Sequence, residues 1–370
     1  MVIVTIIIII AILLAYAEDK DIIKNGRLLS FLLVVVTFSL RYGYGNDFYS
    51  YQQFFYDQDK YSSFMEAVRQ QPGEDVGWLT INYFLQPFGF QFVLFISTLF
   101  LCYIYYLLIG KYAPKPYRWI GVLLFLMYPN LFLLDLSMIR QGLAGALFLF
   151  SFSKAYENKY IQSLVLCAIA FSIHRMAIIC IPFVLIVNLR QYIKPAYVAI
   201  GLLVAFVYLM VNPGFIERTF EQVMSSEFSS EYTSYLYMGG TESIGLGLFS
   251  RIVVIVPSLL WFKSLKEFDK YLSLLFFISA FTILLSIQNV LILRLECFFL
   301  PFSVLIFPRL VSKECVFEKY PHNLKISRLL MIVASFGWCL FSVRSFFHFF
   351  SEPTYVKDYA TFHTVLSLIF

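Results

Sequence analysis

The chain is poor in charged residues. Only 14% of its 370 residues are Asp, Glu, Lys or Arg, whereas soluble proteins carry roughly 25%. Hydrophobic residues make up 60%, and long apolar runs recur along the whole sequence. Such runs exclude a water-soluble domain, because this much apolar surface needs lipid as its solvent. We therefore predict an all-α, polytopic integral membrane protein.

The motifs of soluble enzymes are also missing. The sequence has no Walker loop, no HExxH and no GxSxG, which mark nucleotide-binding, zinc-dependent and hydrolytic sites. Its six cysteines include no CxxC pair, so neither a zinc site nor a redox motif is indicated. No His, Asp or Glu cluster has metal-ligand spacing. We expect no metal, no cofactor and no nucleic-acid partner. Because no nucleotide-binding motif is present, the energy for the reaction must come from an activated substrate or a gradient.

The N-terminal segment lacks the basic region of a secretory signal. No Lys or Arg precedes Lys20, and Glu18 and Asp19 directly follow the apolar run 1–17. A cleaved signal begins with positive charge and ends at small residues. We therefore expect a retained first helix.

Apolar runs of membrane length predict about 10–12 transmembrane helices in a single membrane domain, 1–370. No Gly/Ser linker or low-complexity segment divides the chain. The runs are 2–17, 28–40, 88–109, 119–134, 137–153, 160–173, 176–189, 196–211, 250–262, 271–287, 295–308 and 329–346.

Basic residues predict the orientation of these helices. The connections 18–27, 110–118, 154–159, 190–195, 263–270 and 309–328 hold 18 of the 28 Lys and Arg. Because short cytoplasmic loops are enriched in Lys and Arg, we assign these loops to the cytoplasm. Two larger extracytoplasmic loops, 41–87 and 212–249, then lie on the other side, together with both termini.

Ionisable residues gather at the outward ends of the predicted helices. They are Arg41, Asp47, Asp135, Arg140, His174, Arg175, Arg251, Arg294 and Glu296. Each arginine could reach water by itself or pair with a nearby carboxylate, as Arg140 with Asp135 or Arg294 with Glu296. Arginines from separate helices at one membrane level also fit a shared anion such as a diphosphate, which the guanidinium fork binds well.

Three stretches carry these residues in a recognisable order: RYGYGNDFYSY at 41–51, SMIRQGLA at 137–144 and FSIHRMA at 171–177. With Arg251 and Arg294 further on, they resemble the EpsG/Wzy type of polysaccharide polymerase over roughly residues 28–310. Two positions depart from that family's pattern. Asn46 stands where Thr is commoner, and Arg175 stands where Ser is commoner.

The resemblance implies a metal-independent glycosyltransferase of O-antigen, capsule or exopolysaccharide synthesis. Such an enzyme transfers a growing glycan from undecaprenyl pyrophosphate to the terminal sugar of a lipid-linked repeat unit. It implies a multi-pass protein of the bacterial cytoplasmic (inner) membrane, with its active site facing the periplasm or the exterior. Partners would be undecaprenyl-pyrophosphate-linked glycans, a chain-length regulator and a flippase.

The candidate residues fall into two groups. Asp47 and His174 are the candidates for the proton acceptor, since carboxylate and imidazole both suit general base catalysis. Next to His174, the charge of Arg175 is expected to keep the imidazole neutral. Candidates for binding pyrophosphate or glycan are Arg41, Tyr51, Arg140, Gln141, Arg175, Arg251, Arg294 and Glu296.

Two other classes of protein remain open from the sequence. A glycan-lipid flippase or other secondary transporter also has about twelve helices, but it favours charge near the midplane and internal repeats. The second class is another outer-face transferase, such as an O-antigen ligase or a membrane acyltransferase.

Overall fold

The computed structural model describes residues 2–192, 194–212, 215, 218, 262–286, 294–312, 324–349 and 363–364. Its helices confirm the predicted all-α membrane fold. Four described helices are long and apolar enough to cross a membrane: α1 (Val2–Asp19), α6 (Phe90–Tyr112), most of α16 (Glu267–Ser286) and most of α19 (Leu324–Phe349). Arg251, and the predicted outward segment 212–249 beyond residue 218, lie outside the described residues.

Shorter apolar helices fill the space between the long ones. They are α2 (Gly26–Ser39), α7 (Arg118–Met127), α9 (Ile139–Tyr156), α10 (Tyr160–Ile173), α11 (Cys180–Asn188) and α12 (Pro195–Val211). Of these, α9 lies deepest, since most of its residues are buried. Helix α9 therefore forms the centre of the bundle, with its N-terminus at residue 139 and the predicted site residues directly after it.

Two predicted spans are broken in the structure. The run 119–134 divides into α7 and the short α8 (Phe132–Ser137), with Pro129 between them. The run 295–308 divides into α17 (Glu296–Phe299), a 3₁₀ turn η6 (Leu300–Phe302) and α18 (Ser303–Val311). Proline explains both breaks, because it removes a backbone donor and clashes with the preceding turn of a helix.

The predicted loop 41–87 is helical for most of its length. It contains α3 (Phe48–Tyr56), η1 (Asp57–Lys60), α4 (Phe64–Gln70), α5 (Val76–Leu85) and η2 (Gln86–Phe88). Helix α4 begins at an N-cap serine, Ser63, whose hydroxyl accepts the backbone N–H of Glu66 at 3.2 Å. Before α3, the two-residue strand β1 (Arg41–Tyr42) pairs antiparallel with β2 (His363–Thr364).

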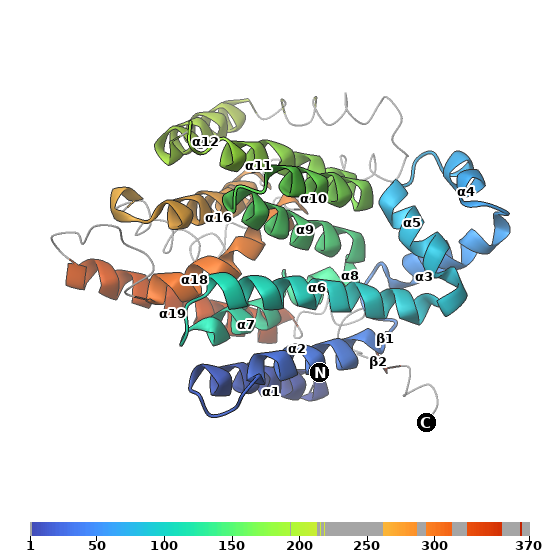
Figure 1. Cartoon of the computed structure of the whole chain (residues 1–370), viewed down its shortest axis with the longest axis horizontal. Coiled ribbons are helices and arrows are strands. Elements are labelled where there is room, and N and C mark those ends of the chain that lie inside the picture. The colour runs from blue at the N-terminus through green and yellow to red at the C-terminus, as the bar shows by residue number, and fades with distance from the viewer. Residues whose placement is uncertain are drawn as a thin grey trace.

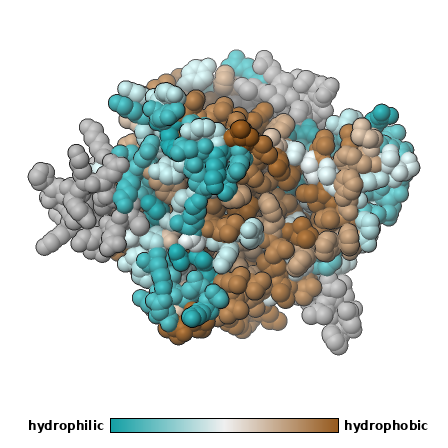
Figure 2. Space-filling view, viewed as in Figure 1, coloured by the Kyte–Doolittle hydropathy of each residue, from teal (hydrophilic) through white to brown (hydrophobic). Residues whose placement is uncertain are grey.

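The bundle has two polar ends separated by an apolar band. In Figure 1 the long helices run side by side, and α3, α4 and α5 gather at the right-hand end. Figure 2 shows the hydrophobic surface lying between hydrophilic residues on either side. This arrangement fits a protein whose middle is covered by lipid.

The loops rich in Lys and Arg meet at the end opposite α3–α5, which we call the basic end. Lys115 pairs with Asp21 and Lys111 with Glu157, which joins three of these loops. Two further contacts bring in the remaining loops. Arg190 donates to the carbonyl of Tyr156 at 2.8 Å, and Arg309 donates to Asp269 at 2.9 Å. Arg309 also donates to the carbonyl of Tyr112 at 2.8 Å, so the described parts of the six connections lie together.

Candidate functional site

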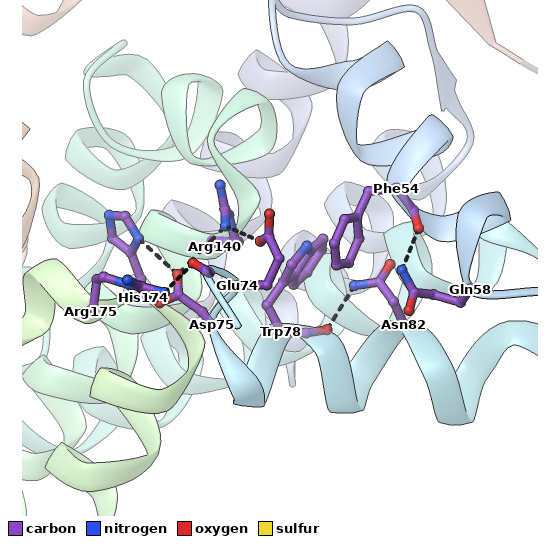
Figure 3. Close-up of polar contacts among 10 residues, drawn as sticks. Phe54, Gln58, Glu74, Asp75, Trp78, Asn82, Arg140, His174 and Arg175 are labelled. Carbon is purple, nitrogen blue, oxygen red and sulfur yellow. Dashed lines mark hydrogen bonds and ion pairs between the residues drawn. The ribbon is translucent and has the colours of Figure 1, made fainter. Parts of the chain in front are cut away.

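A buried aspartate, Asp75, lies among three basic side chains at the end of the bundle opposite the basic end. It is the N-cap residue of α5 and is only 5% exposed. Arg175 donates from Nε to Asp75 Oδ1 at 2.8 Å. The other carboxylate oxygen, Oδ2, lies 3.5 Å from Arg140 Nη1 and 3.7 Å from His174 Nδ1. Figure 3 shows these side chains converging from α5, α9 and the turn after α10.

Glu74 completes this group, which we call the Asp75 cluster: Glu74, Asp75, Arg140, His174 and Arg175. Arg140 Nη1 lies 3.3 Å from Glu74 Oε2, and the Arg140 guanidinium lies 5.7 Å from the ring centre of Tyr51. The suggested pairing of Arg140 with Asp135 is therefore replaced by pairing with two carboxylates from the segment before α5. That segment is distant in sequence, so spacing alone pointed to the wrong partner.

Close packing of α5 against α10 brings Asp75 to His174. A Cβ on Gly77 would lie 2.5 Å from Ser172 Oγ and 2.7 Å from the Ser172 carbonyl carbon. Glycine therefore permits a contact that any other residue would push apart. Two residues beyond Ser172, the extended backbone of His174 ends α10, and its side chain faces the N-terminus of α5.

Asp47 and Tyr51 lie beside the same cluster, at the start of α3. Partial burial raises the pKa of Asp47, while the positive charges of Arg294 and Arg140 oppose this shift. Those two arginines are thus the charged neighbours of the Asp47 carboxylate. Predicted candidates from four separate segments, around residues 47, 140, 174 and 294, therefore meet in one place.

A glycine with positive φ, Gly45, lets the Asp47 segment pack against the bundle. Gly45 has φ +86°, in the left-handed region that favours glycine. A Cβ at this position would also lie 2.2 Å from Ser137 Oγ and 2.5 Å from Ser137 Cβ. Both features fix the backbone just before Asp47 against the α8–α9 junction, next to Arg140.

The electrostatics of the cluster favour an ionised Asp75 beside a neutral His174. Burial opposes ionisation of Asp75, but His174, Arg175 and Arg140 together hold its pKa below the usual range. Burial lowers the pKa of His174; Asp75 opposes this shift, and Arg140 and Arg294 add to it. At 3.7 Å the His174–Asp75 contact is longer than a direct hydrogen bond.

Arg175 was expected to keep His174 neutral, but its side chain is directed away from the imidazole. Its guanidinium points to Asp75 and to the carbonyl of Gly73 rather than to the imidazole. The charges that help keep His174 neutral come from Arg140 and Arg294. Arg175 therefore anchors the carboxylate, and the departure from the commoner Ser brings a further cation to it.

Three candidates are buried within the protein. Arg41 is 1% exposed and donates from Nη1 to the carbonyl of Phe38 and to Thr98 Oγ1, both at 2.9 Å. Gln141 donates from Nε2 to the carbonyl of Arg294 at 2.6 Å, which braces the turn before α17. Glu296 is 3% exposed, in the first turn of α17.

Glu74 and Asp75 lie in the predicted outward loop 41–87 and were not among the predicted site residues. The sequence does contain a pattern that points to them. This acidic pair directly precedes the apolar stretch 76–85, where the N-cap residue of a helix is expected. Within the described ranges, no three His, Cys, Asp or Glu side chains form a group that could hold a metal ion. The arrangement offers several cationic groups, a buried imidazole and two carboxylates at one end of an apolar bundle.

The fold and this cluster define a polytopic α-helical membrane protein with a polar site at one end of its helices. The EpsG family model matches residues 25–353, and the chain belongs to the EpsG family. Membership supports a function of the polysaccharide polymerase type in general. Neither the curated proteins nor the solved structures contain a significant match to this chain.

Proposed function

We propose that this protein is a polysaccharide polymerase of the cytoplasmic membrane, with its active site on the outer face. It transfers a growing glycan from undecaprenyl pyrophosphate to the terminal sugar of a lipid-linked repeat unit. The observation that carries this proposal is the Asp75 cluster, with Arg294 and Asp47 beside it. Family membership adds the general class of reaction.

In the proposed reaction, the acceptor hydroxyl attacks the anomeric carbon of the donor sugar. The new glycosidic C–O bond forms as the bond to pyrophosphate breaks, and undecaprenyl pyrophosphate leaves with the electron pair. Arg140, Arg175 and Arg294 neutralise the pyrophosphate, since a guanidinium keeps its charge and binds phosphate through two N–H groups. Placed in advance, such charges stabilise the transition state without reorganisation.

The proton of the acceptor hydroxyl needs a base, and His174 is the preferred one. Its buried imidazole is held in the neutral form that a base requires. Asp47 is the alternative, but its position between Arg140 and Arg294 also suits orienting those arginines. In this proposal the ring of Tyr51 supports Arg140, Gln141 positions Arg294, and Arg41 and Glu296 hold the surrounding helices.

The remaining features of the proposal concern partners and metal. Undecaprenyl-linked glycans reach the site from the bilayer. The proposed protein partners are a flippase and a chain-length regulator of the same process. Positioned arginines replace a metal ion, so the purified protein should polymerise in EDTA at the untreated rate. Complete loss of activity, restored by Mg²⁺ or Mn²⁺, would contradict metal independence.

Deletion of the gene tests the proposal against its rivals. Loss of a polymerase leaves single repeat units on the carrier at the outer face. Loss of a flippase leaves those units inside the cell, and loss of a ligase leaves polymer unattached. Either of the last two outcomes would overturn the assignment.

A further inference from the structure

Asp75 is fixed in place more firmly than a surface carboxylate would be. It occupies the position just before α5, it accepts a hydrogen bond from Arg175 at 2.8 Å, and its side chain is only 4% exposed. The contact of Gly77 with Ser172 ties the first turn of α5 to the end of α10. The carboxylate therefore has little freedom to move relative to the backbone that precedes His174.

The imidazole of His174 is also fixed, but one of its ring nitrogens makes no hydrogen bond to the described part of the chain. Its ring stacks on Phe298, with ring centres 6.4 Å apart and planes 16° apart. The residue is 7% exposed, and Nδ1 has no hydrogen-bond partner within the described residues. The nearest carboxylate oxygen to Nδ1 is Asp75 Oδ2 at 3.7 Å. A movement of about 1 Å would turn this contact into a hydrogen bond.

We propose that Asp75 is a positioning residue that holds His174 through Nδ1, so that Nε2 serves as the base for the acceptor hydroxyl. This inference rests on the proposed function. Asp75 accepts the Nδ1–H and so selects the tautomer whose Nε2 carries a free lone pair. The hydroxyl proton moves to Nε2 as the oxygen bonds to the anomeric carbon, and Asp75 stabilises the imidazolium that forms. Catalytic contacts of this kind are often long before substrate binds and tighten in the complex.

The charges around His174 define what each substitution should do. Asp75 from α5 faces Nδ1, Arg140 comes from α9, and Arg294 comes from the turn before α17. Arg175 follows His174 directly but points to Asp75. Asp75 is the group that favours the imidazolium, whereas Arg140 and Arg294 disfavour it. Removing the Asp75 charge should therefore lower the pKa of His174.

The test compares Asp75→Asn with Glu74→Gln in the full-length protein in lipid nanodiscs. The neighbouring Glu74 pairs with Arg140 at 3.3 Å and is the matched control, since removing its charge leaves the carboxylate that faces His174 in place. NMR titration of ring-labelled histidine follows the imidazole directly. The chain has four histidines, and a His174→Gln variant assigns the signal. Polymerisation of lipid-linked repeat units, measured against pH, gives kcat and KM.

Asp75→Asn should lower the pKa of His174 and move the acidic limb of the kcat profile to lower pH. At neutral pH kcat should fall by about a hundredfold, the order that a lost general base contributes, without a rise in KM. Asp75→Glu should recover part of kcat, and Glu74→Gln should leave the limb in place. Gly77→Ala, which alters no charge, should reproduce a weaker form of the Asp75→Asn result by moving α5 from α10.

Two results would overturn the inference: an unchanged His174 pKa in Asp75→Asn, or a wild-type kcat in that variant. A wild-type protein that makes no polymer would instead overturn the proposed function, and the base role with it. The titration separates the two cases, because it reports the pairing of Asp75 with His174 without any reaction.

Discussion

Arg309 at the basic end and Arg140 at the opposite end are held in different ways. At the basic end, Arg309 binds Asp269 through Nε and Nη2 and the carbonyl of Tyr112 through Nη1, the latter two at 2.9 and 2.8 Å. At the opposite end, Arg140 approaches Glu74 and Asp75 through Nη1 at 3.3 and 3.5 Å. A guanidinium bound at two points to one carboxylate stabilises structure. One held more loosely between two carboxylates can exchange them for the oxygens of a substrate.

The carboxylates differ in the same sense. At the basic end, Glu157 is partly desolvated, yet Lys111, Lys159 and Lys154 lower its pKa to about 2. Three lysines there share one carboxylate whose side chain is 16% exposed, and such clusters of Lys are typical of the cytoplasmic face of a membrane protein. At the other end, buried Asp75 is surrounded by His174, Arg175 and Arg140. Burial makes those contacts stronger and less sensitive to salt.

The largest expected difference between the ends is their accessibility in intact cells. A cysteine replacing Glu66, in α4, should react with a membrane-impermeant thiol reagent, and so should one replacing Glu231. A cysteine replacing Lys111, at the basic end, should react only after the membrane is opened. If Glu66→Cys and Glu231→Cys were both protected from the reagent in intact cells, the predicted orientation would be wrong.

The next largest effect concerns stability at the basic end. Arg309→Ala leaves Asp269, which is 0% exposed, buried without its ion partner. Breaking such a pair costs about 3–5 kcal/mol, so the variant should show low membrane abundance and a clearly lowered melting temperature in detergent. Lys111→Ala is the control: its side chain is 52% exposed, and the loss should stay within about 0–1 kcal/mol. Equal melting temperatures for the two variants would contradict the expected difference between the buried Arg309 pair and the exposed Lys111 pair.

At the site end, the expected loss is one of activity with little loss of stability. Arg140→Ala removes a charged hydrogen-bond donor worth about 1.5–3 kcal/mol, so polymerisation should slow roughly tenfold to a hundredfold. Arg140→Lys keeps the charge but loses the two-point contact of the guanidinium, so it should retain partial activity. The same difference between alanine and lysine is expected at Arg294. Polymer length on a gel, with abundance checked by blot, measures this. Wild-type ladders from Arg140→Ala and Arg294→Ala at normal abundance would contradict the shared-anion idea.

A smaller effect separates two glycines that share a positive φ. Gly45 and Gly89 have φ +86° and +83°, but only Gly45 faces a close neighbour, Ser137. Alanine at either position should cost about 1–3 kcal/mol of backbone strain. Only Gly45→Ala should also displace Asp47 and shorten the polymer. Identical polymer lengths from the two variants would show that the Gly45–Ser137 contact does not position the site.

Much of the fold is predictable from apolar runs because each helix in lipid must satisfy its own backbone. The bounds of α1, α6, α10 and α19 accordingly follow the predicted spans closely. The short helices α3, α4 and α5 were not predicted, since amphipathic segments of this length lack the continuous apolar run on which the prediction depended. Their presence changes the site, because α5 carries Asp75.

The site was predictable in its residue types but not in its pairings. Motif order placed Asp47, Arg140, His174 and Arg294 at one membrane level, and the structure brings these residues together. Which carboxylate meets which arginine depends on how α5 packs against α9 and α10, and no local spacing encodes that. Arg41 illustrates the same limit: it lies at a helix end in the sequence, yet its side chain is buried between α2 and α6.

Reconstitution of the purified protein tests the central claim most directly. Proteoliposomes containing only this chain and undecaprenyl-pyrophosphate-linked repeat units are sampled over time, and glycan length and free undecaprenyl pyrophosphate are both measured. We predict a growing ladder with one undecaprenyl pyrophosphate released for each new glycosidic bond. Repeat units that stay single while the protein remains folded, or growth without release of the carrier, would contradict the account.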